Sequence, residues 1–273
     1  MNKDIDIVIY GATGFTGQLC VKYLKSVDDG ITWAIAGRNK AKLDEVAKNN
    51  EVEVEIIVAD CEDEEALGLL TKRSKVVLST AGPFHRYGSK LVASCVENSS
   101  HYVDITGENF WVKGLIEKHH EEAASKGIRI IPSCGFDSIP SDLGVLLIQK
   151  EALEKYKIPC EEIKYYVRAT RGGLSGGTIA SMIAISEYIK SNPTLSSLLG
   201  NPYALNSTSF NGPRVSSLRS IKWDDEVKLW LAPFVMSGIN TRIVRRSNEM
   251  LKFKYGKNFL YSEVGAANHH PLQ

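Results

Sequence analysis

The stretch Ile5–Gly17, IDIVIYGATGFTG, decides the fold that we predict for this chain. The apolar run Ile5–Ile9 is typical of a buried β-strand, and a turn with three glycines follows it before a helix-type segment begins. A strand, a glycine turn and a helix in this order can hold the pyrophosphate of a dinucleotide. The reason is that a helix N-terminus offers unpaired N–H groups and a partial positive charge. We therefore predict a nucleotide site at this turn.

Each glycine has its own place in this prediction. Gly11 takes the tight turn out of the strand, Gly14 lets phosphate approach the backbone, and Gly17 lets the helix pack closely on the strand. Thr13 and Phe15 are expected to line the pyrophosphate. The spacing is G-x-x-G-x-x-G rather than the commoner G-x-G-x-x-G, and glycines also serve ordinary turns. The motif therefore needs support from the rest of the chain.

Composition excludes several classes of protein. The chain has 273 residues, enough for one large domain or two modest ones, and its 43% hydrophobic and 24% charged residues are typical of a soluble globular protein. A net charge of +1 without a basic stripe argues against a nucleic-acid partner. Five scattered cysteines without a C-x-x-C pair predict reduced thiols in an intracellular, reducing compartment and no metal site.

The sequence shows no membrane or export signal. No signal peptide opens it, and no stretch reaches the roughly 18 apolar residues that span a bilayer. We expect no transmembrane segment. Peripheral attachment to a lipid surface and assembly into a homo-oligomer stay open at this level.

Residues 1–150 alternate between short apolar runs and helix-type segments, which predicts βαβ units. The expected strands after the first are Thr32–Ala36, Val54–Ala59, Lys75–Thr80, Tyr102–Asp104 and Ile128–Ile131. The expected helices are Thr16–Ser26, Lys40–Asn49, Glu62–Leu70, Gly88–Asn98 and Asn109–Lys126, with a further helix from Leu143. We predict an α/β fold with a Rossmann-type, doubly wound parallel sheet as an NAD(P)-binding domain.

The pattern changes near residue 150, and residues 151–273 predict a second, smaller α+β domain that covers the substrate. Its expected elements are a strand at Glu161–Thr170, a helix at Thr178–Ile189 and strands at Val227–Val235, Leu251–Tyr255 and Phe259–Glu263. Residues 191–220 are rich in Ser, Asn, Pro and Gly and predict a long loop. The final GAANHHPLQ has no periodicity and predicts a frayed end.

Arg38 follows the second predicted strand, where an NAD-binding site usually has an acidic residue. A carboxylate would repel a ribose 2′-phosphate, whereas a guanidinium can hold it with two hydrogen bonds. Lys40 adds positive charge nearby. We therefore favour NADP (NADPH) as the cofactor over NAD, the alternative being that Arg38 is an ordinary solvated loop arginine.

The loop after the fourth predicted strand is expected to flank the nicotinamide ribose, since ligands bind beyond the carboxyl ends of parallel strands. Its cofactor-binding candidates are Thr80, Ala81, Gly82 and Pro83. His85 and Tyr87 follow directly, and either could donate a proton. Tyr87 is the better candidate, because a loop histidine is more often merely solvated.

Two carboxylates complete the set of catalytic candidates, Asp104, Tyr87 and Asp137. Asp104 ends the fifth strand in YVDITGE, where it could orient the substrate, take up a proton or cap the helix near Asn109. Asp137 lies in PSCGFDSIPSD and is expected to face the same crevice with Cys134. Ser141 or Asp142 is the expected N-cap of the helix that follows.

These motifs, read together, resemble the saccharopine dehydrogenase-like oxidoreductase family, which includes bacterial trans-acting enoyl reductases. The resemblance is carried in order by GATGFTG, AGR, STAGPF, YVDITGE, GFDSIPSDLG and GGLSGGT, and it extends from Ile5 to about Glu263. It implies NADP-dependent hydride transfer to or from a small or lipid-like substrate, such as enoyl or keto reduction. It also implies lipid-droplet, mitochondrial or membrane association. Family members are longer, so the resemblance implies a truncated chain with an incomplete second domain.

A competing hypothesis is that the chain is a catalytically silent NADP-binding sensor or a scaffold on lipid surfaces. A Rossmann domain does not by itself specify turnover, and the sequence has no Tyr-x-x-x-Lys pair. The two hypotheses differ in whether a proton donor faces the bound substrate.

Overall fold

The computed structural model describes residues 3–27, 30–136, 138–169, 176–207, 210–214 and 218–268. The chain forms two compact units, the first made of residues 1–134 and 174–193 and the second of residues 135–173 and 194–273. The division thus lies at residue 134, whereas the sequence analysis placed one boundary at residue 150. Helix α8 (Gly176–Ser191), which that boundary assigned to the second domain, groups with the first unit.

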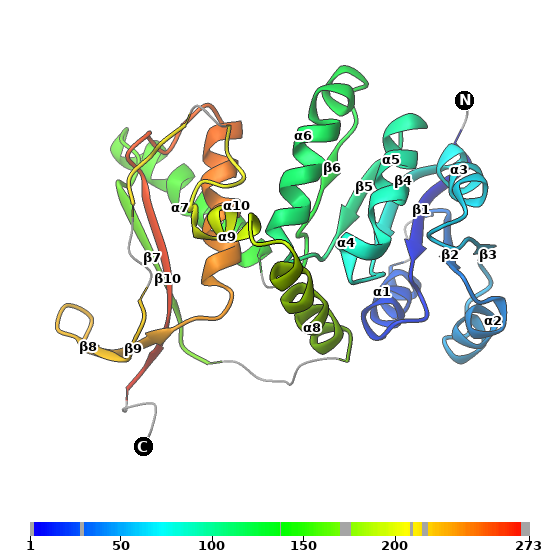
Figure 1. Ribbon diagram of the computed structural model, residues 1–273, viewed down its shortest axis with the longest axis horizontal. Coiled ribbons are helices and arrows are strands. Elements are labelled where there is room, and N and C mark those ends of the chain that lie inside the picture. Colours follow the sequence, from blue (N-terminus) through cyan, green and yellow to red (C-terminus); the bar gives the residue numbers. More distant parts are fainter. Residues whose placement is uncertain are drawn as a thin grey trace. The chain divides into compact units, whose positions relative to one another are not determined.

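The first unit is built on a six-stranded parallel sheet with the strand order β3-β2-β1-β4-β5-β6 (Figure 1). Its strands are β1 (Ile5–Tyr10), β2 (Trp33–Gly37), β3 (Glu55–Val58), β4 (Ser74–Ser79), β5 (His101–Asp104) and β6 (Ile130–Ile131). The order reverses between β1 and β4, which is the switch point of a doubly wound fold. The predicted Rossmann-type sheet is therefore confirmed.

In the described residues the first unit also contains seven helices. They are α1 (Phe15–Ser26), α2 (Lys40–Asn49), α3 (Glu64–Arg73), α4 (Phe84–Tyr87), α5 (Ser89–Glu97), α6 (Asn109–Ser125) and α8. Side-chain caps define where two of these helices begin. The side chain of Asn39 accepts the N–H of Lys42 at the start of α2, and that of Asp63 accepts the N–H of Ala66 at the start of α3. The helices α1 and α2 bury their apolar faces on β1 and β2 in one core cluster around Ile9, Val21, Ile35, Leu43 and Val46.

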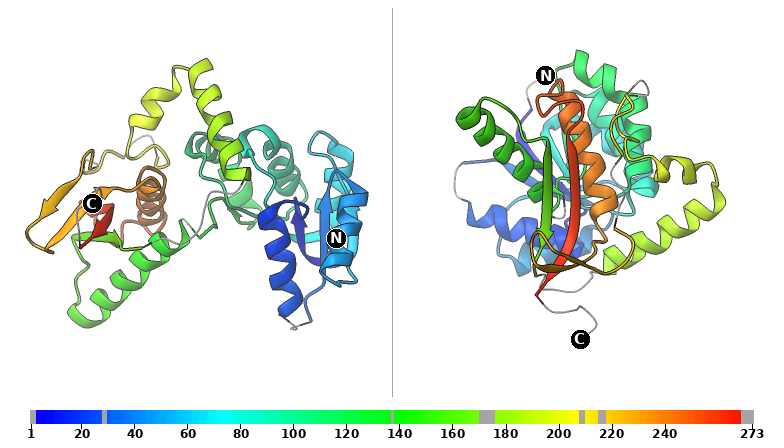
Figure 2. Two further views of the ribbon diagram at one scale, coloured as in Figure 1. Left: turned by 90° about the horizontal axis from the view of Figure 1, so that it is seen from below. Right: turned by 90° about the vertical axis from the view of Figure 1, so that its left-hand side faces the viewer.

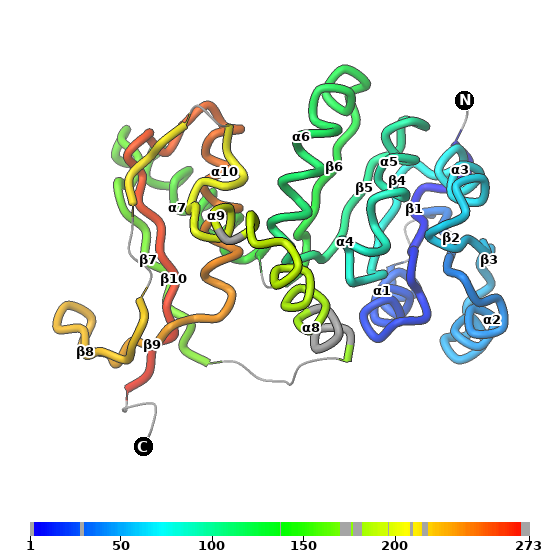
Figure 3. Tube along the Cα trace, viewed as in Figure 1, coloured from blue at the N-terminus to red at the C-terminus, as the bar shows by residue number. Residues whose placement is uncertain are grey.

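The second unit contains a four-stranded mixed sheet with the order β7-β10-β9-β8. Its elements are α7 (Ile139–Tyr156), β7 (Glu162–Val167), α9 (Leu195–Gly200), β8 (Lys222–Asp224), β9 (Leu229–Pro233), α10 (Ser237–Met250) and β10 (Leu260–Ala267). The central strand β10 pairs parallel with β7 and antiparallel with β9, which forms a hairpin with β8 (Figure 3). This is the second α+β fold that the sequence predicts.

The helices α7 and α10 share one core with β7 and β10. Val145 of α7 and Val244 of α10 pack with Ile163 and Tyr261 of the sheet. Figure 2 shows α10 running along β10.

Among the described residues, no helix combines the length and the apolar character that crossing a membrane requires.

Several predicted boundaries in the second unit are wrong. Residues 251–255 form turns rather than a strand, and the preceding helix α10 was missed because its polar, arginine-rich sequence carries few apolar positions. The supposedly frayed end continues β10 to Ala267, which pairs with Trp230. The predicted long loop contains α9. Helix α7 begins at Ile139 with Ser138 as its N-cap residue, earlier than predicted, and Asp142 lies in its first turn.

Two glycines of the first turn are required by the packing of the first unit itself. Gly11 has a φ of +86°, and a Cβ there would lie 2.9 Å from the backbone nitrogen of Ala81. A Cβ on Gly17 would lie 2.4 Å from the carbonyl oxygen of Gly11. At Gly14, in contrast, the nearest atom would lie 3.4 Å away, which is ordinary contact. The fold therefore excludes side chains at positions 11 and 17 but tolerates a methyl group at position 14.

We predict that Gly17→Ala lowers the free energy of unfolding by about 2 kcal/mol, because the methyl group overpacks a backbone contact that has no room to yield. Urea unfolding followed by circular dichroism measures this change. Gly68→Ala in α3 is the matched control, since a Cβ there meets nothing within 4 Å. It should raise the stability by up to about 1 kcal/mol through helix propensity. Equal effects of the two substitutions would contradict this account of the turn.

Candidate functional site

The glycine turn leaves the first turn of α1 without a side-chain cap. Gly14 is the N-cap residue, and its N–H donates to the carbonyl oxygen of Gly11 at 3.0 Å. A glycine has no side chain to accept the N–H groups of residues 15–17, so these donors have no cap of the usual kind. Phe15 is 70% exposed and Thr13 is half-buried beside them. This helix end is open to an anion from outside the chain.

The loop after β4 lies directly against the glycine turn. The backbone N–H of Thr80 donates to the carbonyl oxygen of Tyr10 at 2.9 Å, and its Oγ1 donates to that of Gly11 at 3.1 Å. Ala81 is the residue that a side chain at position 11 would strike. Gly82 and Pro83 follow, and Pro83 is the N-cap residue of α4. The structure therefore brings the two predicted cofactor loops together at the carboxyl edge of the sheet.

Arg38 lies just beyond β2 on the same edge and is exposed. Among the described residues, no carboxylate oxygen lies within 4.0 Å of its guanidinium. The pKa of Asp60 lies below its ordinary value mainly because its carboxylate accepts the N–H of Glu62, and the charge of Arg38 adds to this effect. Within the described part of the chain Arg38 thus has no ion-pair partner, which leaves its guanidinium available to a ligand.

Asp104 is buried at the end of β5, with 1% of its surface exposed. Its Oδ1 accepts the N–H groups of Thr106 and Ser133, both at 2.9 Å. The carboxylate therefore fastens the loop after β5 to the loop after β6. It does not cap α6, whose N-cap residue is Glu108, so that alternative from the sequence is excluded.

A small polar cluster surrounds the second oxygen of Asp104. Strand register places Ser79 opposite Asp104, and Tyr102 lies two residues earlier on the same face of β5. The Oδ2 of Asp104 and the hydroxyl groups of Ser79 and Tyr102 are all buried and make no hydrogen bond of ordinary geometry with a described residue, but the hydroxyl group of Tyr102 lies close to the carboxylate. Burial raises the pKa of Asp104 to about 6, although the two backbone N–H groups and the hydroxyl group of Tyr102 act in the opposite direction. Asp104 can therefore hold a proton close to neutral pH.

His85 and Glu108 form a buried pair at the start of α4. Oε1 of Glu108 accepts the N–H of Phe84 at 2.8 Å, and Oε2 accepts the N–H of His85 at 2.8 Å. The Nδ1 of His85 lies 2.6 Å from the same Oε2. The side chains of His85 and Glu108 are only 6% and 2% exposed. One carboxylate thus fixes both the backbone of α4 and the orientation of the imidazole ring.

Aromatic rings enclose the other side of His85. The ring centroids of Phe110 and Tyr188 lie 5.5 and 5.0 Å from that of His85, and 5.2 Å from each other. The Nε2 of His85 is buried and has no hydrogen-bond partner in the described part of the chain. Tyr188 comes from α8, far along the chain, which explains why this helix belongs to the first unit.

The sequence located this site but ranked its residues differently. Tyr87, the preferred proton donor, lies at the end of α4 with 37% of its surface exposed. His85 is enclosed rather than solvated, and sequence reasoning did not identify Glu108 or Tyr188 as its partners. The one sequence signal for this pair was the position of Glu108 shortly after the end of a predicted strand. Asp137 lies outside the described residues.

We predict that Glu108→Gln lowers the free energy of unfolding by about 3 kcal/mol, because an amide group cannot accept all the hydrogen bonds that the buried carboxylate accepts. Urea unfolding measures this change. Glu121→Gln is the matched control, since Glu121 is exposed on the same helix α6. Equal stability of the two variants would show that Glu108 does not fix the start of α4.

We predict a pH dependence of stability from Asp104. In the unfolded chain an aspartate loses its proton near pH 3.8, whereas Asp104 keeps its proton to about pH 6 in the folded protein. Between these values the folded state binds more protons, so the free energy of unfolding falls as the pH rises. The loss amounts to about 3 kcal/mol. Chemical unfolding of wild type and Asp104→Asn across pH 4–7 should show this decline in the difference between them. A difference that grows with pH would mean that the pKa of Asp104 is lowered instead.

Known proteins resemble both units. Residues 7–131 match the family model of the saccharopine dehydrogenase NADP binding domain. A protein of Mycobacterium tuberculosis (strain H37Rv) named as a trans-acting enoyl reductase is 37% identical over 272 residues, which is 96% of this chain and 65% of that protein. The trans-acting enoyl reductase of Mycobacterium leprae is 35% identical over 273 residues with the same coverage. The chain thus spans 65% of the length of these relatives.

A solved structure shows the same fold. The apo saccharopine dehydrogenase (L-Glu forming) of Saccharomyces cerevisiae superimposes with a TM-score of 0.53 at 14% identity, covering 96% of this chain and 54% of that one. The resemblance that the motifs predicted is confirmed. Residues 7–131 of this chain are thus similar to the saccharopine dehydrogenase NADP binding domain.

Proposed function

We propose that the first unit binds NADP(H) and that the protein is an NADP-dependent oxidoreductase. The observation that carries this proposal is the uncapped first turn of α1, held against the Thr80–Ala81 loop by the two glycines that the fold requires. Gly14 supplies independent support. Its surroundings would accept a methyl group without a clash, so packing alone does not require a glycine there, and the bare backbone suits the approach of a phosphate.

The residues fit the parts of this cofactor one by one. The backbone at Gly11, Gly14 and Gly17, with Thr13 and Phe15 beside it, would hold the pyrophosphate. The exposed guanidinium of Arg38 would hold the ribose 2′-phosphate, which is the reason to favour NADP over NAD. The loop after β4 would flank the nicotinamide ribose through Thr80, Ala81, Gly82 and Pro83. A nicotinamide cofactor supplies the hydride, and the protein supplies binding, orientation and a proton.

For the proton we propose two groups at the carboxyl edge of the sheet. Tyr87 is 37% exposed, and we propose that its hydroxyl group reaches a ligand. Asp104 is too deeply buried for direct contact, and we propose that it holds a proton and acts through the neighbouring hydroxyl groups of Tyr102 and Ser79. Asp137 stays a candidate for orienting the substrate. All three roles are predictions.

The substrate proposal comes from the relatives. Because the mycobacterial relatives are named trans-acting enoyl reductases, we propose reduction of a C=C bond in a small or lipid-like acyl substrate. Keto reduction and attachment to a lipid surface are further predictions from the family resemblance. Slow oxidation of NADPH in the presence of an enoyl thioester would support the oxidoreductase hypothesis. Binding of NADPH without turnover of any enoyl or keto substrate would support the silent sensor instead.

We predict that NADPH binds at least about tenfold more tightly than NADH and that Arg38→Asp removes the preference, because a guanidinium–phosphate contact is replaced by charge repulsion. Calorimetry with both nucleotides measures this. Lys22→Glu on the exposed face of α1 is the control for the change in net charge and should keep the preference. If the Arg38 variant binds NADPH as tightly as wild type does, Arg38 is not the 2′-phosphate ligand.

A further inference from the structure

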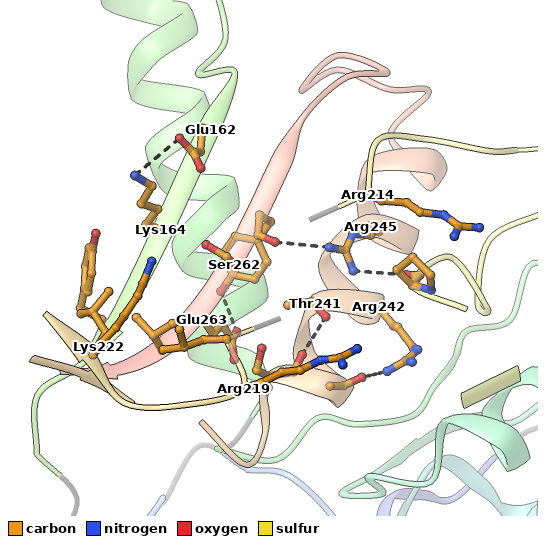
Figure 4. A pocket seen from close by; sticks show the side chains of 18 of the residues that line it. Glu162, Lys164, Arg214, Arg219, Lys222, Thr241, Arg242, Arg245, Ser262 and Glu263 are labelled. Carbon is orange, nitrogen blue, oxygen red and sulfur yellow. Dashed lines mark hydrogen bonds and ion pairs between the residues drawn. The ribbon is translucent and has the colours of Figure 1, made fainter. Parts of the chain in front are cut away.

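The second unit contains a large pocket that the proposed function does not use. It has a volume of about 1020 Å³ and is lined by β7, β8, β10, α10 and the irregular segments that follow α9 (Figure 4). Every lining residue belongs to the second unit. The pocket is far larger than a single water or ion needs, so it has room for a small molecule.

Positive charge gathers around this pocket from separate segments of the chain. Its lining includes six cationic side chains and three carboxylates, although the whole chain has a net charge of only +1. The cations are Lys164, Arg214, Arg219, Lys222, Arg242 and Arg245. Figure 4 shows them on β7, on the segment before β8, on β8 and on α10. Convergence of like charges from distant positions is costly unless something compensates for it.

The three carboxylates of the pocket do not pair with its arginines in the described structure. Glu162 lies 3.8 Å from Lys164, a cation of the pocket that also lies 3.2 Å from Glu226 and is therefore compensated. Asp224 accepts the backbone N–H groups of Glu226 and Val227 at 3.0 and 3.2 Å. Glu263 accepts the hydroxyl group of Tyr261 at 2.7 Å and the amide group of Asn240 at 3.0 Å. None of these contacts neutralises an arginine of the pocket.

Arg245 is buried and Arg242 is partly buried, and no carboxylate oxygen of the described residues lies within 4.0 Å of either guanidinium. Arg245 donates to the carbonyl oxygens of Pro202 and Tyr261, both at 3.3 Å, and lies 5.2 Å from the ring centroid of Tyr203. Arg242 donates to the carbonyl oxygen of Asn201 at 2.9 Å and also to those of Leu199 and Gly238. Burial lowers the pKa of both arginines, and the charge of Arg245 lowers the pKa of Arg242 further. Carbonyl groups and a tyrosine ring attract these cations but do not neutralise their charge.

Two further cations and an apolar wall complete the pocket. Arg219 and Lys222 are exposed, and no carboxylate oxygen of the described residues lies within 4.0 Å of either. Tyr166, Leu218 and Leu231 also line the pocket, where Tyr166 and Leu218 pack against the core cluster that contains Leu231. Cationic and apolar groups therefore face the same space.

We propose that this pocket binds a small molecule that carries an oxyanion, either a phosphate or a carboxylate, together with an apolar portion. The oxyanion lies among Arg219, Lys222 and Arg242, where it compensates their charge. The apolar portion lies along Tyr166, Leu218 and Leu231. The residues of this site all belong to the second unit, and its existence does not depend on the proposed oxidoreductase activity.

The test is calorimetric binding of four probes to the whole 273-residue chain. Octyl phosphate and octanoate carry both features, inorganic phosphate lacks the apolar portion, and octyl glucoside lacks the charge. We expect octyl phosphate or octanoate to bind at least about tenfold more tightly than either of the other two probes. Whichever binds more tightly identifies the kind of oxyanion.

A double variant, Arg219→Gln with Lys222→Gln, should weaken binding of the preferred probe at least about tenfold, since two charge-assisted contacts are lost. Both residues are exposed, so the variant should keep the thermal unfolding midpoint of wild type. Lys254→Gln, an exposed lysine of the same unit outside the pocket, is the matched control and should leave binding unchanged.

Four results would overturn the proposal. Equal binding of inorganic phosphate and octyl phosphate would exclude the apolar portion. An equal loss of binding in the Lys254→Gln control would show non-specific charge attraction. The absence of binding by every probe at millimolar concentration would exclude the site. Displacement of the bound probe by NADPH would show that the site is not separate from the nucleotide site, whereas failure of NADPH to bind anywhere would refute only the proposed function.

Discussion

The first unit depends on one close backbone approach, between the turn that leaves β1 and the start of α1. At Gly17 the helix lies so near the carbonyl group of Gly11 that a methyl group has no space. Gly11 in turn lies against Ala81 of the next loop in a backbone conformation that favours glycine. These contacts fix the helix N-terminus at the edge of the sheet. An anion site follows, because the first N–H groups of α1 have neither a helical partner nor a side-chain cap.

Buried carboxylates assemble the remainder of this edge. Asp104 joins the loops after β5 and β6 through two backbone N–H groups, and Glu108 fixes the start of α4 through two others. Such groups are costly to bury and stay ionised only where donors surround them. Glu108 accepts the N–H groups of Phe84 and His85 with its two oxygens, whereas the Oδ2 of Asp104 makes no hydrogen bond of ordinary geometry with a described residue. Burial raises the pKa of Asp104, which can therefore hold a proton, while Glu108 orients His85.

The sequence predicted the features of the fold that depend on residues close together in the chain. The strand and glycine pattern of residues 5–17 predicted the sheet, the turn and the helix, and the alternation that follows predicted the doubly wound order. It could not predict that Tyr188 packs on His85, because this contact joins residues far apart in the chain and depends on the path of α8. Nor could it predict the pocket of the second unit, whose cations lie between positions 164 and 245 and show no common spacing. Helix α10 escaped detection because arginines with buried stems occupy positions where a helix usually has apolar residues.

The central claim is that the uncapped end of α1 is where the nucleotide binds. The most direct measurement is a titration of the isotope-labelled protein with NADPH, followed through its backbone amide resonances by NMR. The account predicts that the largest shifts fall on the amides of Phe15, Thr16 and Gly17, with smaller shifts at Arg38 and at Thr80–Gly82. Shifts confined to the second unit, or none at saturating NADPH, would contradict it.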